Sequence, residues 1–209
     1  MYGAWLFVVA LSILAKSTDR GFWVGIPVIF LGECVRIWSH GYIQKTLQLA
    51  TEGPYAYVRN PLYVGNFLIG SGFCLIIWHP MVAVIFVMGF YLVYWVTIKG
   101  EEQRLADKFQ GAYQDYLKRV PRFIPRLTSY ERYGKGVFVL SRAWRHGEHI
   151  TILAIASFLI LIYLRQELFQ ERQLFSEIAL SPIFSFVILV TLLLLSMRLR
   201  YFGKRVAKA

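Results

Sequence analysis

Long runs of apolar residues constrain this chain more than any other feature of its sequence. Of its 209 residues, 57% are hydrophobic, and they are gathered in blocks. A helix needs about 20 apolar residues to cross a bilayer, and about 17 at the low end. We therefore predict an all-α, polytopic membrane protein with about six spans, of which the first and fifth are short. These spans are Tyr2–Ala15, Gly21–Trp38, Leu62–Trp78, Met81–Ile98, Ile150–Leu164 and Pro182–Met197.

The positive charge of the chain follows the loops between these spans. The formal net charge is +11, but the lysines and arginines do not form a basic face with base-stacking aromatic residues, so no nucleic-acid partner is expected. They gather in the segments 39–61 and 99–149 and in the C-terminal tail. The positive-inside rule then predicts that these segments and both termini are cytoplasmic. Six crossings satisfy this arrangement, and the Lys16–Arg20 turn fits it least well.

A stretch of polar and rigid residues, Gly53–Gly65, lies between two of the apolar runs. Charged and strongly polar groups at a bilayer face are costly and tend to mark a functional site. Pro54 and Pro61 also fix the backbone and remove two amide donors. A second polar cluster, Lys99–Leu105, follows the apolar hairpin 62–98. The hairpin is expected to bring the two clusters together at the cytoplasmic face of the membrane.

An amphipathic helix is expected after the fourth span. Its apolar positions recur at helical spacing while charged residues take the other faces, a pattern typical of a helix that lies at the headgroups. We expect it to end before Pro121, because the residue that precedes a proline is disfavoured in helical geometry. The apolar positions are Leu105, Phe109, Tyr113, Tyr116 and Leu117.

Several common kinds of site do not fit the sequence. It has no glycine-rich phosphate loop after a strand and no nucleophile elbow. The segment His146–His149 has a metal-ligand spacing but no third ligand cluster, so no metal site is expected. Cys34 and Cys74 lie within spans, where small apolar packing residues are the expected interpretation. Gly65, Gly70, Ser71 and Gly72 in the third span favour close approach between membrane helices.

Two sets of charged residues remain for chemistry at the membrane face. In the first, Arg59 is expected to face Glu101 and Glu102, and only one of these glutamates can point inward because successive helical residues are about 100° apart. The alternative for this set is purely structural. The two glutamates would then lie at a solvated helix start, and Arg59 would extend to the lipid headgroups. The second set consists of three residues on one face of the second span. Its acid and its arginine either neutralise each other or help to line a cavity at the membrane face. These three are Glu33, Arg36 and His40.

The polar motifs together resemble those of a known group of enzymes. Gly-Pro-Tyr-x-x-x-Arg-Asn-Pro-x-Tyr-x-Gly is followed by Glu-Glu-x-x-Leu-x-x-x-Phe, Tyr-x-x-Tyr and Arg-Val-Pro-Arg-Phe-Ile-Pro. This pattern, over about residues 40–126, is similar to that of the integral-membrane isoprenylcysteine carboxyl methyltransferase and phospholipid methyltransferase superfamily. The resemblance implies S-adenosylmethionine as cofactor, bound in a cytosol-facing cavity, and a lipid-like methyl acceptor that enters from the bilayer.

The resemblance also implies which residues hold the cofactor, and it includes two departures. Asn60 stands where the prenylcysteine branch has a histidine, and Thr97 stands where that branch has a substrate-binding arginine. Both departures argue against prenylcysteine as the acceptor and leave the cofactor site intact. The implied cofactor contacts are His40, Leu47, Gln48, Leu49, Ala50, Tyr55, Asn60, Pro61, Leu62, Tyr63 and Glu101.

The charges of the cofactor are consistent with these assignments. It carries a sulfonium, an ammonium and a carboxylate, so a site of low dielectric constant needs a counter-charge such as Glu101 and a cation such as Arg59. Tyr55 and Tyr63 can offer ring faces to the sulfonium, worth about 0.5–2 kcal/mol. A carboxylate or thiolate acceptor needs no general base, whereas an ammonium headgroup would need one, from Glu102 or His40. Arg59 and Glu102 are the predicted catalytic residues.

The sequence therefore predicts a membrane methyltransferase in three parts. Residues 1–126 form the core with the cofactor site, 127–149 a basic cytoplasmic connector, and 150–209 a helical pair through which copies could associate. The expected reaction moves a methyl group from S-adenosylmethionine to a lipophilic or amphipathic acceptor at the cytoplasmic leaflet. The alternatives are a phospholipid amine N-methyltransferase and a non-catalytic membrane scaffold or transport subunit that keeps the fold.

Overall fold

The structure, a computed structural model, describes residues 17, 19–43, 49–130 and 136–170 of the chain. Over these residues it is helical and contains no strand, which confirms the predicted all-α class. The predicted first and last spans, Tyr2–Ala15 and Pro182–Met197, lie outside the described residues. The elements are α2 (Asp19–Tyr42), the 3₁₀ turn η1 (Gly53–Ala56), α3 (Pro61–Ile77), α4 (Pro80–Arg119), α5 (Leu140–Arg145) and α6 (Glu148–Gln170).

Three of these helices have the length and composition of membrane spans. They are α2, α4 and the Glu148–Gln166 part of α6, while α3 is a shorter apolar helix of 17 residues. Apolar helices of this kind are those of an integral membrane protein. The number of six spans stays a prediction.

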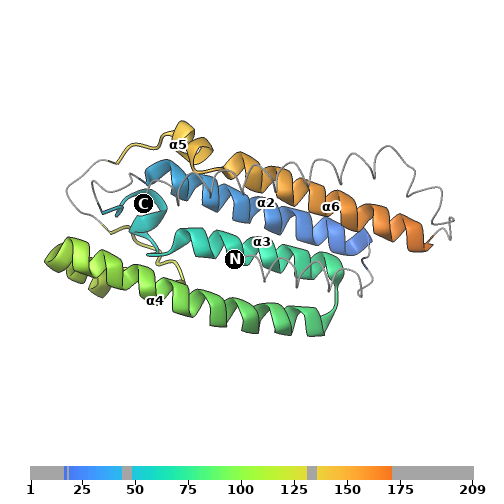
Figure 1. The fold of residues 1–209 in the computed structure, drawn as a ribbon, viewed down its shortest axis with the longest axis horizontal. Coiled ribbons are helices and arrows are strands. Elements are labelled where there is room, and N and C mark those ends of the chain that lie inside the picture. Colours follow the sequence, from blue (N-terminus) through green and yellow to red (C-terminus); the bar gives the residue numbers. More distant parts are fainter. Residues whose placement is uncertain (1–16, 18, 44–48, 131–135, 171–209) are drawn as a thin grey trace, which may run out of the picture. The chain divides into compact units, whose positions relative to one another are not determined.

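The chain divides into two compact units, residues 1–148 and 149–209. Almost all of α6 belongs to the second unit. In the first unit α3 lies between α2 and α4, and packs against both (Figure 1). The predicted boundaries at residues 126 and 149 remain a prediction.

Helices α2 and α3 pack through glycines, so their backbones approach each other closely. A Cβ atom on Gly32 would lie 2.7 Å from the carbonyl oxygen of Gly65, and one on Gly72 would lie 2.7 Å from the carbonyl oxygen of Gly25. Either contact is shorter than a real Cβ atom tolerates. Small residues that allow such an approach are typical of membrane helix pairs. The expected role is confirmed for Gly65 and Gly72, whereas Gly70 faces the ring of Phe86 on α4.

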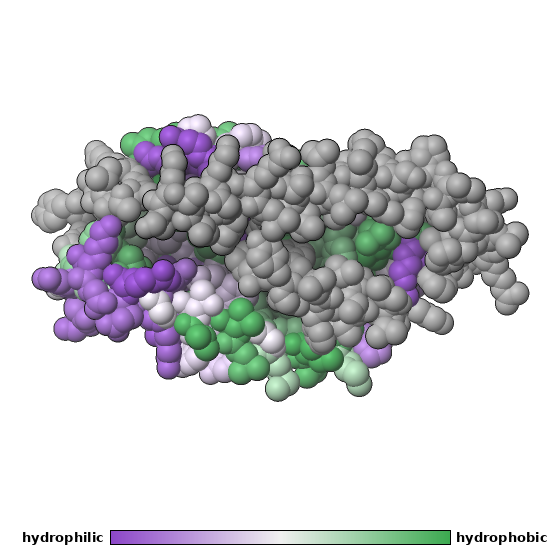
Figure 2. Space-filling model, viewed as in Figure 1, coloured by the Kyte–Doolittle hydropathy of each residue, from purple (hydrophilic) through white to green (hydrophobic). Residues whose placement is uncertain are grey.

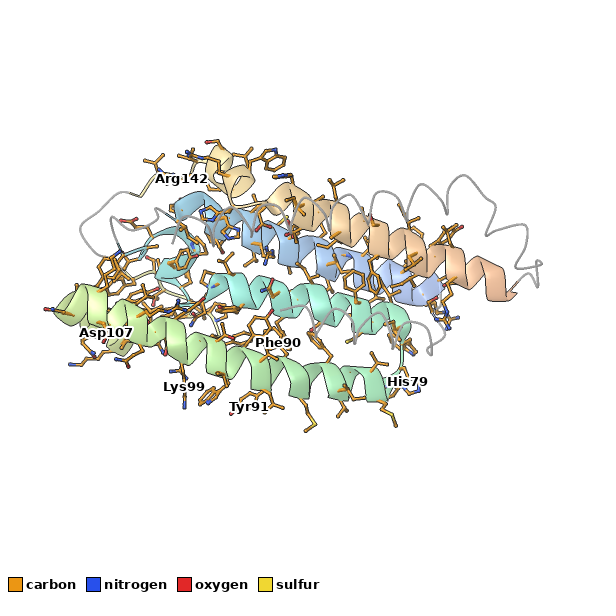
Figure 3. The ribbon with its side chains drawn as sticks, viewed as in Figure 1. His79, Phe90, Tyr91, Lys99, Asp107 and Arg142 are labelled. Carbon is orange, nitrogen blue, oxygen red and sulfur yellow. The ribbon has the colours of Figure 1, made fainter. Side chains whose placement is uncertain are left out.

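Helices α3 and α4 are instead separated by aromatic side chains. The ring of Phe67 on α3 lies 5.7 Å from that of Phe86 and 5.0 Å from that of Phe90, both on α4. Phe123, which follows α4, contributes a further ring 5.6 Å from Phe67 and 5.9 Å from Phe90. Figure 3 shows Phe90 on the side of α4 that faces α3, and Tyr91 on the opposite side. These four phenylalanines are called the aromatic layer below.

Helix α4 joins a membrane part to an amphipathic part. It runs for 40 residues and is interrupted at Gln110, whose φ of 44° and ψ of −124° are not helical. It ends at Arg119, before Pro121, as predicted. Figure 2 shows apolar side chains along the visible face of the first part and hydrophilic side chains near the end of the second. The fourth span and the amphipathic helix are thus one long helix with a break.

The amphipathic part of α4 packs against η1 through buried tyrosines. Tyr113, Tyr116 and Tyr130 form a core with Ala56 and Val120, called the tyrosine cluster below. Three backbone hydrogen bonds hold the segment that contains η1 against the chain after α4. The amides of Arg59, Arg126 and Tyr130 donate to the carbonyls of Pro121, Tyr57 and Ala56, at 2.9, 3.0 and 2.9 Å.

Candidate functional site

The motif Gly53–Gly65 is shaped by residues with special backbone requirements. Gly53 has a φ of +58°, which favours glycine, and a Cβ atom there would lie 2.6 Å from ring atoms of Tyr42. Pro54 then opens η1, and Pro61 opens α3 at a position where the missing amide costs no helical hydrogen bond. The chain therefore turns back at the membrane face and enters α3 in one defined direction.

The two polar clusters meet where α3 begins and the second part of α4 approaches. The phenol of Tyr63 lies beside the carboxylate of Glu101 and interacts with its charge. The phenol of Tyr55 lies near both groups, and its burial raises its pKa well above the ordinary value. Tyr55 is therefore a neutral phenol over the whole physiological range. The hairpin brings the two clusters together, as the sequence predicts.

Glu102 faces a different set of partners from its neighbour. The guanidinium of Arg122 donates to both of its oxygens, from Nε to Oε1 at 3.1 Å and from Nη2 to Oε2 at 2.6 Å. Nη1 of Arg59 lies 3.3 Å from Oε1. The hydrogen bond to Glu102 raises the pKa of Arg122. Both oxygens of the Glu102 carboxylate therefore face guanidinium groups.

One hydrogen-bond donor of the Arg59 side chain is not used by its neighbours. Its side chain is only 12% exposed, and it contacts Glu102 and Tyr113. Its Nε atom is buried and has no hydrogen-bond partner among the described residues. A buried donor without a partner costs free energy, so a ligand that supplies an acceptor would be favoured here. Asn60, the next residue, uses its amide nitrogen to donate to the Arg122 carbonyl at 3.1 Å.

His40 lies in a separate group of charged residues on α2. Its Nδ1 atom contacts the carboxylate of Glu148, and its ring stacks on His146 with centroids 4.6 Å apart. Arg36 donates to the same carboxylate, from Nη2 to Oε1 at 2.7 Å and from Nε to Oε2 at 3.2 Å. Oε2 of Glu33 is farther from Arg36, at 3.6 Å. Glu148, and not Glu33, is thus the main partner of Arg36.

The other predicted contacts are spread around the first cluster. Leu49 packs against the tyrosine cluster, and Ala50 is half-buried. Pro61 is buried and Leu62 half-buried at the start of α3. Leu47 and Gln48 lie outside the described residues. Thr97, at the position of the family's arginine, is exposed, and its hydroxyl donates to the carbonyl of Val93 at 2.7 Å.

Two polar residues that the sequence analysis did not select connect these groups. Asn66 accepts a hydrogen bond from Nη1 of Arg36 and donates one to the hydroxyl of Tyr94 at 3.3 Å. The ring of Tyr94 meets that of Tyr63 edge to face, with centroids 4.8 Å apart. An asparagine inside an apolar span, three residues after Tyr63, was the available signal.

The sequence also matches known proteins in this region. The model of a family described as phospholipid methyltransferase matches residues 21–112. The chain is 31% identical over 141 residues, 61% of its length, to the nickel-cobalt-cadmium resistance protein NccN of Alcaligenes xylosoxydans xylosoxydans. It is 33% identical over 133 residues, 59% of its length, to the cobalt-zinc-cadmium resistance protein CzcN of Cupriavidus metallidurans. It spans 66% and 61% of the length of these two relatives.

A further relative belongs to the prenylcysteine branch. The chain is 35% identical over 77 residues to the protein-S-isoprenylcysteine O-methyltransferase of Schizosaccharomyces pombe, which is 37% of this chain and 33% of that protein. No solved structure matches the chain. The family match includes α2, η1, α3 and the part of α4 that carries Glu101 and Glu102. Residues 21–112 therefore belong to the superfamily of integral-membrane isoprenylcysteine carboxyl methyltransferases and phospholipid methyltransferases.

Proposed function

We propose that the protein transfers a methyl group from S-adenosylmethionine to a lipophilic or amphipathic acceptor at the cytoplasmic face of the membrane. One observation supports this most directly. In the region that matches the family, the phenol of Tyr63 lies beside the carboxylate of Glu101, near the buried Tyr55. A carboxylate and two aromatic hydroxyls gathered at a membrane face suit a charged cofactor better than they suit helix packing.

The residues of this cluster fit the polar groups of the cofactor. Glu101 would hold the ammonium, and the buried Nε of Arg59, which has no partner among the described residues, would donate to the carboxylate. Tyr55 and Tyr63 would offer their rings or hydroxyls to the sulfonium and the ribose. When bound, the cofactor supplies an electrophilic methyl group. Leu49 and Ala50, with the predicted Leu47 and Gln48, would flank the adenosine, beside Asn60, Pro61 and Leu62.

Glu102 would act by positioning Arg59 and not as a general base. Its carboxylate oxygens already accept from Arg122 and face Arg59, so neither is directed at a bound acceptor. His40, the other predicted base, is in contact with Glu148. Both groups are engaged within the protein, so an acceptor that arrives already deprotonated would suit this site best. Catalysis would then come mainly from holding the two reactants in line and away from water.

The distribution of charge supports the cytoplasmic face as the place of reaction. Both polar clusters and the basic segments 39–61 and 99–149 lie at one end of the predicted spans, and the positive-inside rule assigns that end to the cytoplasm together with both termini. The acceptor and the surrounding lipids would be the main partners. Association of copies through residues 150–209 remains part of the proposal.

Cofactor binding tests this function without knowledge of the acceptor. Titration calorimetry with S-adenosylmethionine in detergent should give saturable binding to the full chain. Glu101→Gln and Tyr63→Phe should each weaken it by about tenfold or more, because the first removes the counter-charge for the ammonium and the second removes a hydroxyl beside it. Asp107→Asn is the matched control: this exposed carboxylate lies on the same helix, where it accepts a hydrogen bond from Gln103 (Figure 3). Unchanged affinity in both site variants would contradict the assignment.

The description of the matched family supports a second candidate, a phospholipid amine N-methyltransferase. Mass spectrometry of membrane lipids after incubation with methyl-labelled S-adenosylmethionine separates the candidates. Label in an amine headgroup favours the second candidate, and label on another lipophilic compound favours the first. A chain that binds no cofactor would instead be a scaffold that keeps the fold. Among the described residues, no group of three or more His, Cys, Asp or Glu side chains is placed to hold a metal ion.

A further inference from the structure

We propose that Tyr94 is a further acceptor-binding residue, whose hydroxyl donates a hydrogen bond to an oxygen atom of the methyl acceptor. The inference rests on the proposed methyl transfer and goes beyond it, because it assigns a residue and a chemical requirement to the acceptor side of the site. It is drawn from the contacts that connect Glu148 to Tyr63 across α2, α3 and α4.

The first step is the orientation of the Asn66 amide. A guanidinium can only donate hydrogen bonds, so the Asn66 atom that contacts Arg36 must be the carbonyl oxygen. The amide nitrogen then faces the hydroxyl of Tyr94, to which it donates at 3.3 Å. Arg36 is itself held by two hydrogen bonds to the Glu148 carboxylate. The orientation of Asn66 is therefore fixed by charge and not by packing alone.

The second step concerns the proton of the Tyr94 hydroxyl. The oxygen already accepts from Asn66, and no acceptor for the proton is recorded within the described part of the chain. Tyr94 is half-buried in a helix of membrane-spanning composition, where an unmatched donor is costly. The positive charge of nearby Arg36 further favours a negatively polarised partner. A ligand oxygen would satisfy this donor.

The third step is the position of Tyr94 between the candidate cofactor site and the aromatic layer. Its ring is stacked on Phe90, 4.1 Å between centroids, and meets Tyr63 edge to face at 4.8 Å. Tyr94 lies one helical turn after Phe90 and so shares the side of α4 that Figure 3 shows facing α3. An acceptor whose head reaches Tyr63 would thus place its head beside this hydroxyl and its apolar part along the aromatic layer.

The chemistry of the transfer is consistent with such a contact. With a carboxylate as nucleophile, one oxygen forms the bond to the methyl carbon while the bond from carbon to sulfur breaks and its electron pair stays on sulfur. No proton moves in this step. The hydroxyl of Tyr94 would hold the other oxygen of the carboxylate and so fix the approach of the first. An amine head would offer no lone pair to this donor once it had become a nucleophile.

The test uses the full chain in lipid nanodiscs, methyl-labelled S-adenosylmethionine, and two probes of equal chain length, myristate and tetradecylamine. Tyr94→Phe keeps the ring and removes the hydroxyl. We expect about a tenfold rise in KM for myristate, with the affinity for S-adenosylmethionine unchanged. Asn66→Ala leaves the hydroxyl but frees its orientation, so a smaller rise is expected. Tyr91→Phe, on the opposite side of α4, should behave as the unaltered protein (Figure 3).

Each remaining outcome counts against the inference. A Tyr94→Phe protein with unchanged KM would show that the hydroxyl does not touch the acceptor. Loss of cofactor affinity in this variant would place Tyr94 in the cofactor site, and methylation of tetradecylamine alone would exclude an acceptor oxygen. Unaltered protein that binds cofactor but methylates neither probe would overturn the inference too. Absence of cofactor binding to the unaltered protein would instead overturn the proposed function itself.

Discussion

The two faces of α3 are packed in opposite ways. Toward α2, glycines let the backbones meet, and a Cβ atom on Gly32 would come within 2.7 Å of a carbonyl oxygen. Toward α4, rings of the aromatic layer separate the helices, with centroids 5.0–5.7 Å apart between Phe67 and its partners on α4. The first contact depends on backbone shape and the second on side chains that can change rotamer.

This difference suggests how one helix can serve both stability and substrate access. Backbone contacts fix the distance between α2 and α3, so Arg36 and Asn66 are held in register. Helix α4 is held to the motif that precedes α3 by ion pairs at the membrane face, through Arg59 and Glu102, and by rings along its length. Separation of α3 and α4 would cost side-chain contacts only. We infer that the α2–α3 pair is the rigid part and that α4 is the adaptable wall.

The largest expected effect comes from a bulky residue in the glycine contact. Gly32→Leu should lower the free energy of unfolding by about 3 kcal/mol or more, because the added Cβ meets backbone atoms of Gly65 and Ile69 at 2.7–2.9 Å. Unfolding by denaturing detergent, followed by circular dichroism, measures this change. Gly89→Leu is the control, since nothing lies within 4 Å of a Cβ atom there. Equal stability of the two variants would refute the rigid-pair interpretation.

The next effect concerns the ion pairs that hold the start of α3 to α4. Glu102→Gln keeps the shape but removes the charge that faces Arg59 and Arg122, and leaves a guanidinium that is 12% exposed without its partner. We expect a loss of about 2 kcal/mol in stability, less than for a fully buried pair because Arg122 is 32% exposed. Cofactor affinity should fall with it, since Arg59 would no longer be held. Asp107→Asn, on the exposed side of α4, should change neither quantity.

A smaller loss is expected within the aromatic layer. Phe90→Leu removes ring contacts with Phe67 and Tyr94 but keeps an apolar side chain that neighbouring rings can close upon. The same detergent titration should show a loss of about 1 kcal/mol, well below that of Gly32→Leu. A larger loss than for Gly32→Leu would reverse the comparison and make the α3–α4 contact the rigid one.

The sequence predicted the parts of this arrangement that depend on local pattern. Apolar runs identified the helices, Pro121 marked the end of α4, and the length of the hairpin 62–98 placed Glu101 beside Tyr63. Glu101 and Glu102 do face different partners, but both lie at the site, whereas the sequence predicted that only one would point inward. The features predicted correctly follow from helical periodicity and from residues with fixed backbone requirements.

What the sequence did not predict depends on contacts between distant elements. Glu33, one turn before Arg36, was an expected partner of that arginine. The shorter contacts of Arg36 are instead with Glu148, which lies 112 residues later in the chain. The bridge from Asn66 to Tyr94 required the relative rotation of α3 and α4, which no periodicity supplies. The break at Gln110 is likewise invisible, since glutamine is a good helix former and the neighbouring pattern stays helical.

That break gives the smallest expected effect, and one of opposite sign. Gln110 joins the part of α4 along the aromatic layer to the part on the tyrosine cluster, in a conformation (φ 44°, ψ −124°) that suits glycine. Gln110→Gly should therefore raise the free energy of unfolding by up to about 1 kcal/mol, the relief of strain being partly offset by the added freedom of the unfolded chain. Gln114→Gly, at an ordinary helical position of the same part, should instead lower stability by about 1 kcal/mol. Changes of opposite sign in the free energy of unfolding would show that packing at the two ends of α4 imposes the break. One end packs in the aromatic layer and the other on the tyrosine cluster. A loss in both variants would show that α4 is a continuous helix, and its membrane part could not then adapt independently of the part on the tyrosine cluster.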